Sequence, residues 1–436
     1  MPKAAAVTPF ALSLQKAGLG VRLSMVMFAL SALFLWSLVL QAPLRFGLAK
    51  VHLDALIYLP KLLLLAAIVF LPLLRPRTSP PALMVSALAV LYLVWGAANL
   101  PSLEQAAFGL WVLVPLLFGL WAGSMVRTEL WGRLFLSLFI VAALGVFLNT
   151  FIHYPWIGQT LDLLGKQIEV SRQWSAFGID RYAGFARASF NAASELLLFG
   201  IMLVVLLKRR SVKLLVWLIT GAGIALTTSK GALGAWLVVS MYFAGGALLR
   251  WPRYWIQLWL LAFTLILLAM ILMPLSSLWV HYDPNLHGYL NKFLFASFGE
   301  RLDWMWPDSL HLLNLDGAWH WWVGRGLGGI GAAQQYFEPA RYLAGDNLFV
   351  YVTVYVGLPV ALLLFAALWW HVVRLTLASN AVAWRLPVIL ALVAYGVVMN
   401  EVEEDLLVFF WGLVMSMSNR AGSRGEDRLG KCINQS

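Results

Sequence analysis

The sequence predicts an all-α polytopic membrane protein of about 12 transmembrane helices with two long loops on its external face. Three observations predict this fold class. Hydrophobic residues make up 61% of the 436 residues and charged residues only 12%, and the mean hydropathy is +0.81; one soluble core cannot bury that much apolar surface. Apolar runs recur at roughly the 20-residue length that crosses a bilayer. Lys and Arg residues concentrate in every second connection between these runs.

The apolar runs set the order of the predicted helices. Their centres lie near residues 28–40, 56–73, 84–95, 108–121, 134–148, 192–206, 214–226, 233–247, 258–271, 349–366, 388–398 and 406–417. The resulting segments are helices one to five in 1–149, a first long loop in 150–191, helices six to nine in 192–272, a second long loop in 273–346, helices ten to twelve in 347–418 and a polar tail in 419–436. The second loop is too apolar for a disordered linker, so we expect short helices there that cover a cavity at the outer leaflet.

The basic residues predict the orientation of the helices, because cytoplasmic loops are enriched in Lys and Arg. The predicted cytoplasmic set is Lys3, Lys16, Arg22, Arg75, Arg77, Arg127, Arg133, Lys208, Arg209, Arg210, Lys213, Arg250, Arg253, Arg374, Arg385, Arg420, Arg424, Arg428 and Lys431. Both termini are then cytoplasmic, and both long loops face the outside.

Charge and residue usage argue against several other classes. The net charge of +11 does not indicate a nucleic-acid partner, because the basic residues serve as orientation signals between apolar runs. The single cysteine excludes an intrachain disulfide. The histidines of the second loop are not at metal-ligand spacing, so we expect neither a metal site nor a cofactor. No small-residue cleavage site follows the first apolar run, so we expect a span there and not a cleaved signal peptide.

Cationic residues from separate external segments are the candidate binding groups. Lys230 lies in a turn of about five residues between two runs, where desolvation of its ammonium is costly. Arg181 and Arg187 end the first loop, and Arg301 and Arg325 lie in the second. Cations gathered at one membrane face suit an anionic lipid headgroup, because Lys and Arg bind phosphate well. The structural alternatives are a snorkelling Lys230, headgroup anchors at Arg181 and Arg187, an Arg301 paired with a neighbouring acid, and a turn residue at Arg325.

Acidic residues at the same face are the candidate bases. Asp346 and Asn347 open the tenth apolar run, and Glu401 and Glu404 precede the last one. Carboxylates at a helix N-terminus also interact favourably with the helix dipole, and a helix N-cap is the structural alternative for Asp346. A carboxylate at a low-dielectric interface can have a raised pKa and accept a proton from a substrate hydroxyl.

Four sequence blocks, in order, resemble the O-antigen ligase and polymerase superfamily. RYAGFARASFN is similar to its Arg-x-x-Gly segment with a downstream Asn, and LTTSKGALGAW to its Thr-x-Ser-Arg-Gly block, with Lys230 in the Arg place. ERLDWMW followed by VGRGLGG is similar to its Arg…Gly-x-Gly block. GDNLFVYVTVYVGL resembles its late motif, in which a polar pair, typically His–Asn, precedes an aliphatic residue and a glycine. The resemblance covers residues 175–370.

The resemblance implies a GT-C-like fold in the bacterial inner membrane. It also implies a metal-independent transfer of a glycan from undecaprenyl diphosphate to an acceptor hydroxyl on the periplasmic face. The roles it implies are catalysis for Asp346 and Asn347, binding of the donor diphosphate for Arg181, Arg187, Lys230 and Arg301, and secondary roles for Arg325, Glu401 and Glu404. Since Asp346 stands in the place of the family's His, we favour a polymerase, whose acceptor is another lipid-linked glycan, over a ligase, whose acceptor is lipid A–core.

A transporter of lipid-linked glycans is the alternative from another class. Transporters typically contain internal repeats and charges within their spans. This sequence has no convincing repeat, its apolar runs are nearly free of charge, and its polar residues gather on one face. These features favour chemistry at the outer leaflet, and a purely structural scaffold does not account for the ordered motif blocks.

Overall fold

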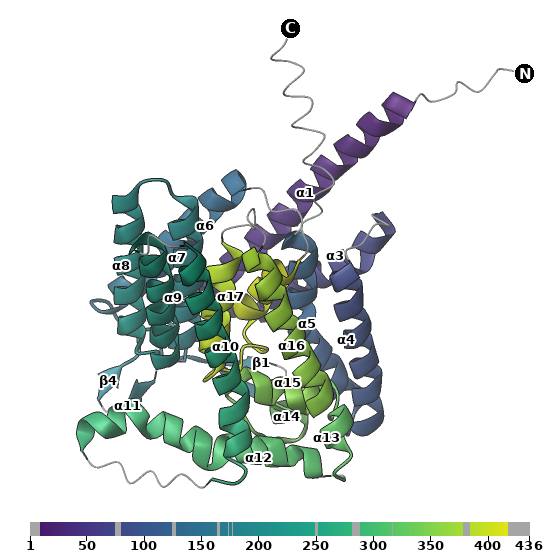
Figure 1. The fold of residues 1–436 in the computed structure, drawn as a ribbon, viewed down its shortest axis with the longest axis vertical. Helices are drawn as coiled ribbons and strands as arrows, with labels where there is room; N and C mark the ends of the chain where they lie inside the picture. Colours follow the sequence, from purple (N-terminus) through teal and green to yellow (C-terminus); the bar gives the residue numbers. More distant parts are fainter. Residues whose placement is uncertain are drawn as a thin grey trace, which may run out of the picture.

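The computed structural model is mostly helical (Figure 1). It describes residues 9–74, 80–123, 128–163, 166–172, 174–176, 178–248, 252–280, 288–315, 317–377 and 384–416. The predicted polar tail and several of the predicted cytoplasmic basic residues lie outside these ranges.

Every predicted apolar run coincides with a helix. These helices are α1 (Pro9–Val39), α3 (Leu59–Leu74), α4 (Pro80–Asn99), α5 (Leu103–Ala122), α6 (Thr128–Asn149), α7 (Ser189–Leu206), α8 (Arg210–Thr227), α9 (Lys230–Leu248), α10 (Pro252–Ser276), α15 (Leu348–Val356), α16 (Leu358–Leu377), α17 (Arg385–Gly396) and α18 (Asp405–Met415). Within the described ranges, seven helices are long and apolar enough to cross a membrane, namely α4, α5, α6, α7, α8, α10 and α16. Helix α1 and the following α2 (Gln41–Lys50), bent by 82°, form an eighth candidate. The chain is therefore a polytopic membrane protein, and the full set of twelve spans stays a prediction.

The predicted tenth helix is divided in two. A single helix over 349–366 is wrong, because α15 ends at Gly357, whose φ is +81°. This left-handed conformation is one that glycine adopts readily. Pro359 follows within the first turn of α16, where a missing backbone N–H does not disturb the helix.

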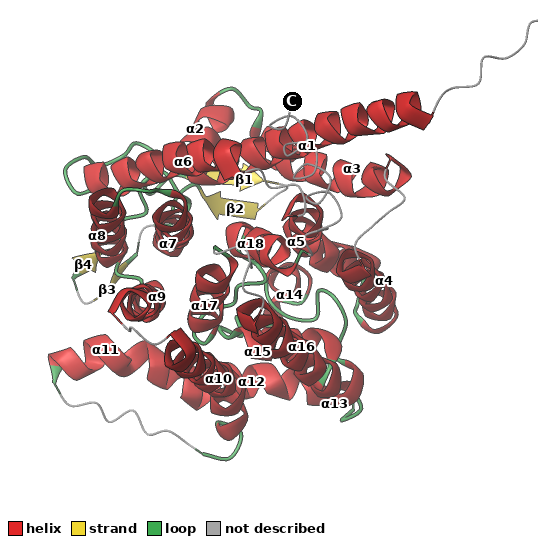
Figure 2. Ribbon diagram, turned by 45° about the horizontal axis from the view of Figure 1, so that its top comes forward, coloured by secondary structure: helices red, strands yellow, loops and turns green. Residues whose placement is uncertain are grey.

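Burial along the helices separates a central from a peripheral set (Figure 2). The spanning window of α7 is 78% buried and that of α5 is 67% buried, whereas those of α4, α10 and α16 are buried over only 22–28%. The outward side chains of the peripheral helices are apolar, as Val94, Leu261 and Leu363 illustrate. Contiguous exposed apolar surface of this kind fits contact with lipid.

Helices α5 and α18 pack closely in the centre. A Cβ atom on Gly119 of α5 would meet the carbonyl oxygen of Phe409, and one on Gly412 of α18 would meet the carbonyl oxygen of Leu116. Small residues at a helix interface permit such close approach of two backbones. This packing fixes the start of α18, which Glu401, Glu403 and Glu404 directly precede.

The first long connection contains strands that the sequence did not predict. Strands β1 (Thr160–Leu163) and β2 (Lys166–Glu169) form an antiparallel pair, with Thr160 opposite Glu169. Strands β3 (Ser175–Ala176) and β4 (Ile179–Asp180) form a second pair. An apolar cluster of Ala42, Tyr154, Trp156 and Val170 attaches this connection to α2.

The second long connection contains short helices, several of which lie across one end of the bundle (Figure 1). They are α11 (Tyr289–Glu300), a π-helical turn (Arg301–Met305), α12 (Trp306–His311), a 3₁₀ turn (Leu312–Asn314), α13 (His320–Val323), α14 (Ala332–Phe337) and a further 3₁₀ turn (Pro339–Arg341). Trp306 is fully buried and anchors α12 against the rest of the protein.

Candidate functional site

An ion pair between Arg301 and Asp346 lies at the centre of the candidate site. Nη2 of Arg301 donates to Oδ2 of Asp346 at 2.9 Å. The side chains are 16% and 26% exposed, so solvent reaches both groups. Nη1 of Arg301 also donates to the carbonyl oxygen of Ser297 at 2.7 Å. The π-helical turn that begins at Arg301 interrupts the α11–α12 helix, and such turns are frequent at functional sites.

Asn347 holds Asp346 in place. The Asn347 side-chain oxygen accepts from the Val350 N–H at 3.0 Å and caps α15. Its amide nitrogen donates to the carbonyl oxygens of Met270 (3.1 Å) and Val397 (2.9 Å), so the side chain also ties α10 and α17 to α15. Because Asn347 is fully buried with these bonds made, its geometry indicates a structural role and not the predicted catalytic one. The helix cap is Asn347, not Asp346.

Arg181 and Lys230 join Arg301 and Asp346 from two other segments. Arg181 follows β4, Lys230 begins α9, and their charges interact with each other and with Arg301. Burial, followed by the charge of Arg301, lowers the pKa of Arg181. Three cations and one carboxylate from four segments therefore converge, and we name these four residues the Asp346 group.

Arg187 belongs to a different set of charges. The ionisable groups that influence the pKa of Arg187 are Arg45 of α2, Arg172, Glu404 and Tyr58. The Arg172 N–H donates to the Arg187 carbonyl oxygen at 2.7 Å, which holds the two backbones side by side. Burial, followed by the charges of Arg45 and Arg172, lowers the pKa of Arg187 to about 10. Arg45, Arg172 and Arg187 form what we name the Arg187 group, whereas Arg301 is among the charges that influence Arg181 and Lys230.

Of the acidic residues between α17 and α18, Glu401 is fully buried, whereas Glu403 and Glu404 are partly buried. Burial, followed by the charge of Asp405, raises the pKa of Glu404 to about 8, and its carboxyl group accepts from Nδ2 of Asn191. Burial raises the pKa of Glu401 well above its usual range. Oε2 of Glu401 accepts from Nε1 of Trp411 at 2.6 Å. With a pKa of about 8, the Glu404 carboxyl group is mainly protonated at pH 7 and is a poor candidate for a general base.

Glu403, which the sequence did not single out, is the acid that interacts with Asp346. Burial raises its pKa, and the charge of Asp346 adds to this shift. Its carboxylate accepts from the Ala332 N–H and from the Tyr351 hydroxyl at 2.8 Å. Tyr342 lies within electrostatic range of Glu403, Asp346 and Arg172, so it connects the Asp346 group with the Arg187 group.

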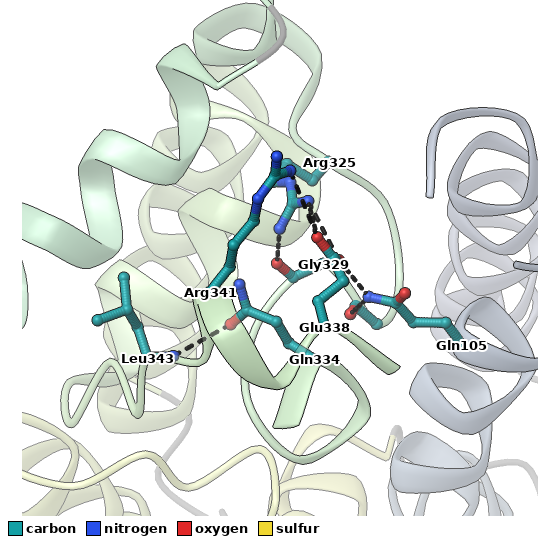
Figure 3. A network of polar contacts seen from close by, with 8 residues as sticks. Gln105, Arg325, Gly329, Gln334, Glu338, Arg341 and Leu343 are labelled. Carbon is teal, nitrogen blue, oxygen red and sulfur yellow. Dashed lines mark hydrogen bonds and ion pairs between the residues drawn. The ribbon is translucent and has the colours of Figure 1, made fainter. Parts of the chain in front are cut away.

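Arg325 is engaged in a buried network of its own (Figure 3). Its Nη2 donates to both carboxylate oxygens of Glu338, at 3.1 and 3.2 Å, and its Nη1 donates to the Gly329 carbonyl oxygen. Nε2 of Gln105 donates to the same carboxylate at 2.7 Å. The Arg325 side chain is 3% exposed. These contacts indicate a structural role, not contact with a donor diphosphate.

The glycine-rich segment around Arg325 packs against α4 and α5. The Leu327 N–H donates to the Tyr92 carbonyl oxygen at 3.1 Å. The carbonyl oxygens of Gly324 and Gly328 accept from Trp95 and Gln105, at 3.0 and 2.9 Å. The glycines thus permit close contact between this segment and two helices, whereas the sequence suggested an approach to a ligand.

Two further ionisable residues, Lys61 and Arg45, were not among the predicted site residues. Nζ of Lys61, on α3, lies 2.6 Å from Oδ1 of Asp405 at the start of α18. The signal in the sequence was a lysine inside an otherwise apolar run. Arg45 lies on the short helix α2, which no apolar run marked. In the described ranges, no three His, Cys, Asp or Glu side chains gather in a way that would hold a metal ion.

The chain matches no family model, and no curated protein or solved structure is significantly similar to it.

Proposed function

We propose that the chain is a membrane glycosyltransferase that moves a glycan from undecaprenyl diphosphate to an acceptor hydroxyl at the periplasmic face of the bacterial inner membrane. The favoured reaction is the polymerisation of a lipid-linked polysaccharide such as O-antigen, without a metal ion. The alternative acceptor is lipid A–core, which would make the protein a ligase.

The observation that carries this proposal is the Asp346 group. Its three cations come from segments far apart in the sequence, and the Arg301–Asp346 pair places a carboxylate directly beside one of them. Three cations offer charge-assisted hydrogen bonds to a diphosphate. The carboxylate offers a proton acceptor at the same place. Glycosyl transfer to a hydroxyl requires groups that stabilise the leaving diphosphate and a base that accepts the hydroxyl proton.

The reaction follows from these roles. The acceptor oxygen forms a bond to the anomeric carbon of the donor sugar while the bond from that carbon to the diphosphate oxygen breaks. The diphosphate leaves with the electron pair, and Arg181, Lys230 and Arg301 stabilise the charge that develops on it. The proton of the acceptor hydroxyl passes to the Asp346 carboxylate.

The test is Asp346→Asn in purified protein supplied with a lipid-diphosphate-linked repeat unit. General-base catalysis contributes about 10²- to 10⁴-fold, so we expect the rate of glycan transfer to fall at least about 100-fold. Asp303→Asn is the matched control, because Asp303 is exposed and lies two residues from Arg301. Thermal denaturation of both variants shows whether they are folded. Transfer by folded Asp346→Asn at more than about a tenth of the normal rate contradicts the proposed base.

A deletion strain separates the two acceptors. Loss of the polymerase leaves a single repeat unit attached to lipid A–core. Loss of the ligase instead leaves long chains on the polyprenyl lipid and none on the core. An unchanged surface glycan in the deletion strain contradicts both reactions.

A further inference from the structure

Exposed leucines form a stripe along α10, with an exposed aromatic residue beyond each end. The leucines recur at intervals of three and four positions, which places them on one face of the helix. They are Leu258, Leu261, Leu265, Leu268 and Leu272. Seven positions after Leu272, and just beyond the end of α10, Trp279 is 78% exposed. Tyr254 is exposed near the start of the helix.

This pattern is typical of a helix face in contact with lipid. Leucines match the hydrocarbon core, whereas Trp and Tyr are enriched where the core meets the headgroups. Tyr254 and Trp279 are 25 positions apart. Along a helix this separation corresponds to about 37 Å, which is the core thickness of about 30 Å with part of the headgroup region on each side. The pattern therefore indicates that the Trp279 end of α10 lies at a membrane interface.

Two more exposed tryptophans lie on α13, at the same end of the bundle (Figure 1). Trp322 is 70% exposed and Trp319 is 42% exposed. Nε1 of Trp95, about one turn before the end of α4, donates to the carbonyl oxygen of Gly324 at 3.0 Å. A Cβ atom on Gly357, directly before α16, would meet the carbonyl group of Trp322. Both contacts place α13 at the level where a candidate membrane span ends.

The two spans that α13 contacts present apolar surface to their surroundings. The exposed residues of α4 again recur at intervals of three and four positions, at Leu83, Ala87, Val90, Val94 and Ala98. On α16 they include Leu362, Leu363 and Trp370. The spanning windows of both helices are buried over only 22% of their residues. α13 therefore adjoins the ends of two surfaces that fit contact with lipid.

α13 is also firmly connected to the helix that begins at the candidate site. In the segment after α13, the Arg325 N–H donates to the Val354 carbonyl oxygen at 2.8 Å, and the Gly326 N–H donates to the Tyr355 carbonyl oxygen at 3.0 Å. Both acceptors lie in the last turn of α15, whose other end lies next to Asp346. A fixed depth of α13 in the membrane would therefore also fix the depth of Asp346.

We propose that α13 binds the headgroup region of the bilayer through Trp319 and Trp322 and anchors the second long connection to the membrane surface. The partner is a phospholipid bilayer, at the interface that the predicted orientation makes external. Indole rings suit this place because they are apolar and also carry an N–H donor for headgroup oxygens. Continuity with the apolar faces of α4 and α16 favours lipid over a soluble glycan. The inference is independent of the proposed glycosyltransferase function.

Spin labelling of the full chain measures this depth. The chain has one cysteine, Cys432, so Cys432→Ser provides a cysteine-free background in which Trp322→Cys introduces a single label. Val94→Cys is the reference in the hydrocarbon, and Gln159→Cys is the reference in water, because Gln159 is exposed in the polar first connection. The protein is placed in nanodiscs of phosphatidylcholine and phosphatidylglycerol. Power saturation then compares the access of oxygen, which concentrates in hydrocarbon, with that of a water-soluble nickel chelate.

The label at 322 should be less accessible to the nickel chelate than the label at 159 and more accessible than the label at 94. Its depth should lie within about 7 Å of the boundary between hydrocarbon and headgroups. Chelate access equal to that at 159 would place α13 in water, where its indoles could bind a glycan, and this result overturns the inference. A depth equal to that at 94 overturns the placement at the interface.

A second label tests the same plane without altering α13. Trp279→Cys leaves both indoles of α13 in place, and its label should lie within about 7 Å of the depth measured at 322. A larger difference in depth overturns the inference, because the two tryptophans would not share one interface. Thermal denaturation shows whether each labelled variant is folded. If Trp322→Cys does not fold, Trp319→Cys takes its place in the same comparison.

Discussion

Replacement of Arg325 by Met tests whether this arginine supports the fold or binds a substrate. The change removes two hydrogen bonds to Glu338 and one to Gly329, and it leaves the 6%-exposed Glu338 side chain without its main counter-charge. Removing one partner of a buried ion pair costs about 3–5 kcal/mol. Gln105 still donates to Glu338, and the exposed Arg341 lies 3.8 Å from it, so the lower end of this range, about 3 kcal/mol, is expected.

The assay is thermal denaturation in detergent, followed by tryptophan fluorescence. A loss of about 3 kcal/mol should lower the melting temperature by about 3 °C, because the unfolding entropy scales with chain length. Glu338→Gln combined with Arg325→Met should recover part of the loss, because the double variant buries no unpaired charge. Arg341→Met should cost less than about 1 kcal/mol, since it breaks only an exposed, long contact. A stable Arg325→Met protein that no longer binds the donor lipid would refute this reasoning and return Arg325 to the binding site.

Three further predictions concern the frame of the site. Asn347→Ala should lower the free energy of unfolding by about 2–4 kcal/mol, because the helix cap and two buried carbonyl partners are lost; a loss below about 1 kcal/mol in the same assay contradicts this role. Gly412→Ala should lower the melting temperature, because the new Cβ collides with α5. Gly234→Ala is the control, since the space around its Cβ is open, and equal melting temperatures of the two variants contradict the close packing of α5 and α18. The Glu404 carboxyl binds its proton more tightly in the folded state, so the free energy of unfolding should fall as pH rises from 4.5 to about 8. Glu404→Gln should reduce this fall, and identical pH profiles of the two proteins contradict the raised pKa.

The apolar runs could be predicted from the sequence, because the length and hydropathy of a segment determine whether it can cross a bilayer as a helix. The helix break at Gly357 could not be predicted in this way, because one glycine inside an apolar run changes neither its length nor its hydropathy appreciably. Strands β1 and β2 were missed for a related reason, since four-residue strands in a polar connection carry too little alternation of apolar and polar residues to be recognised.

Polar partners were harder to predict than helices. A lysine inside an apolar run indicates that an acid is near, but the sequence does not say which one, and Lys61 pairs with Asp405, 344 positions away. The pairing of Arg301 with Asp346 spans 45 positions and could be anticipated only through the resemblance of their motifs to one family. No motif predicted the interactions of Glu403, Tyr342 and Arg45, which were found only in the folded structure.

Arg181 and Arg187 interact with different charges on the two sides of a single turn. Arg181 and Arg187 lie six positions apart, and both were expected to bind one diphosphate. Between them, Gly184 adopts a φ of +62°, and its N–H donates to the Asn149 side-chain oxygen at 3.1 Å. A Cβ at this position would collide with the backbone of Gly145 and Val146, so α6 fixes the turn at a place that only glycine fits. Arg181 lies within electrostatic range of Arg301, and Arg187 lies within that of Arg45 and Arg172. Two arginines of one predicted binding loop therefore lie among different charges on the two sides of this glycine, which their spacing of six residues did not indicate.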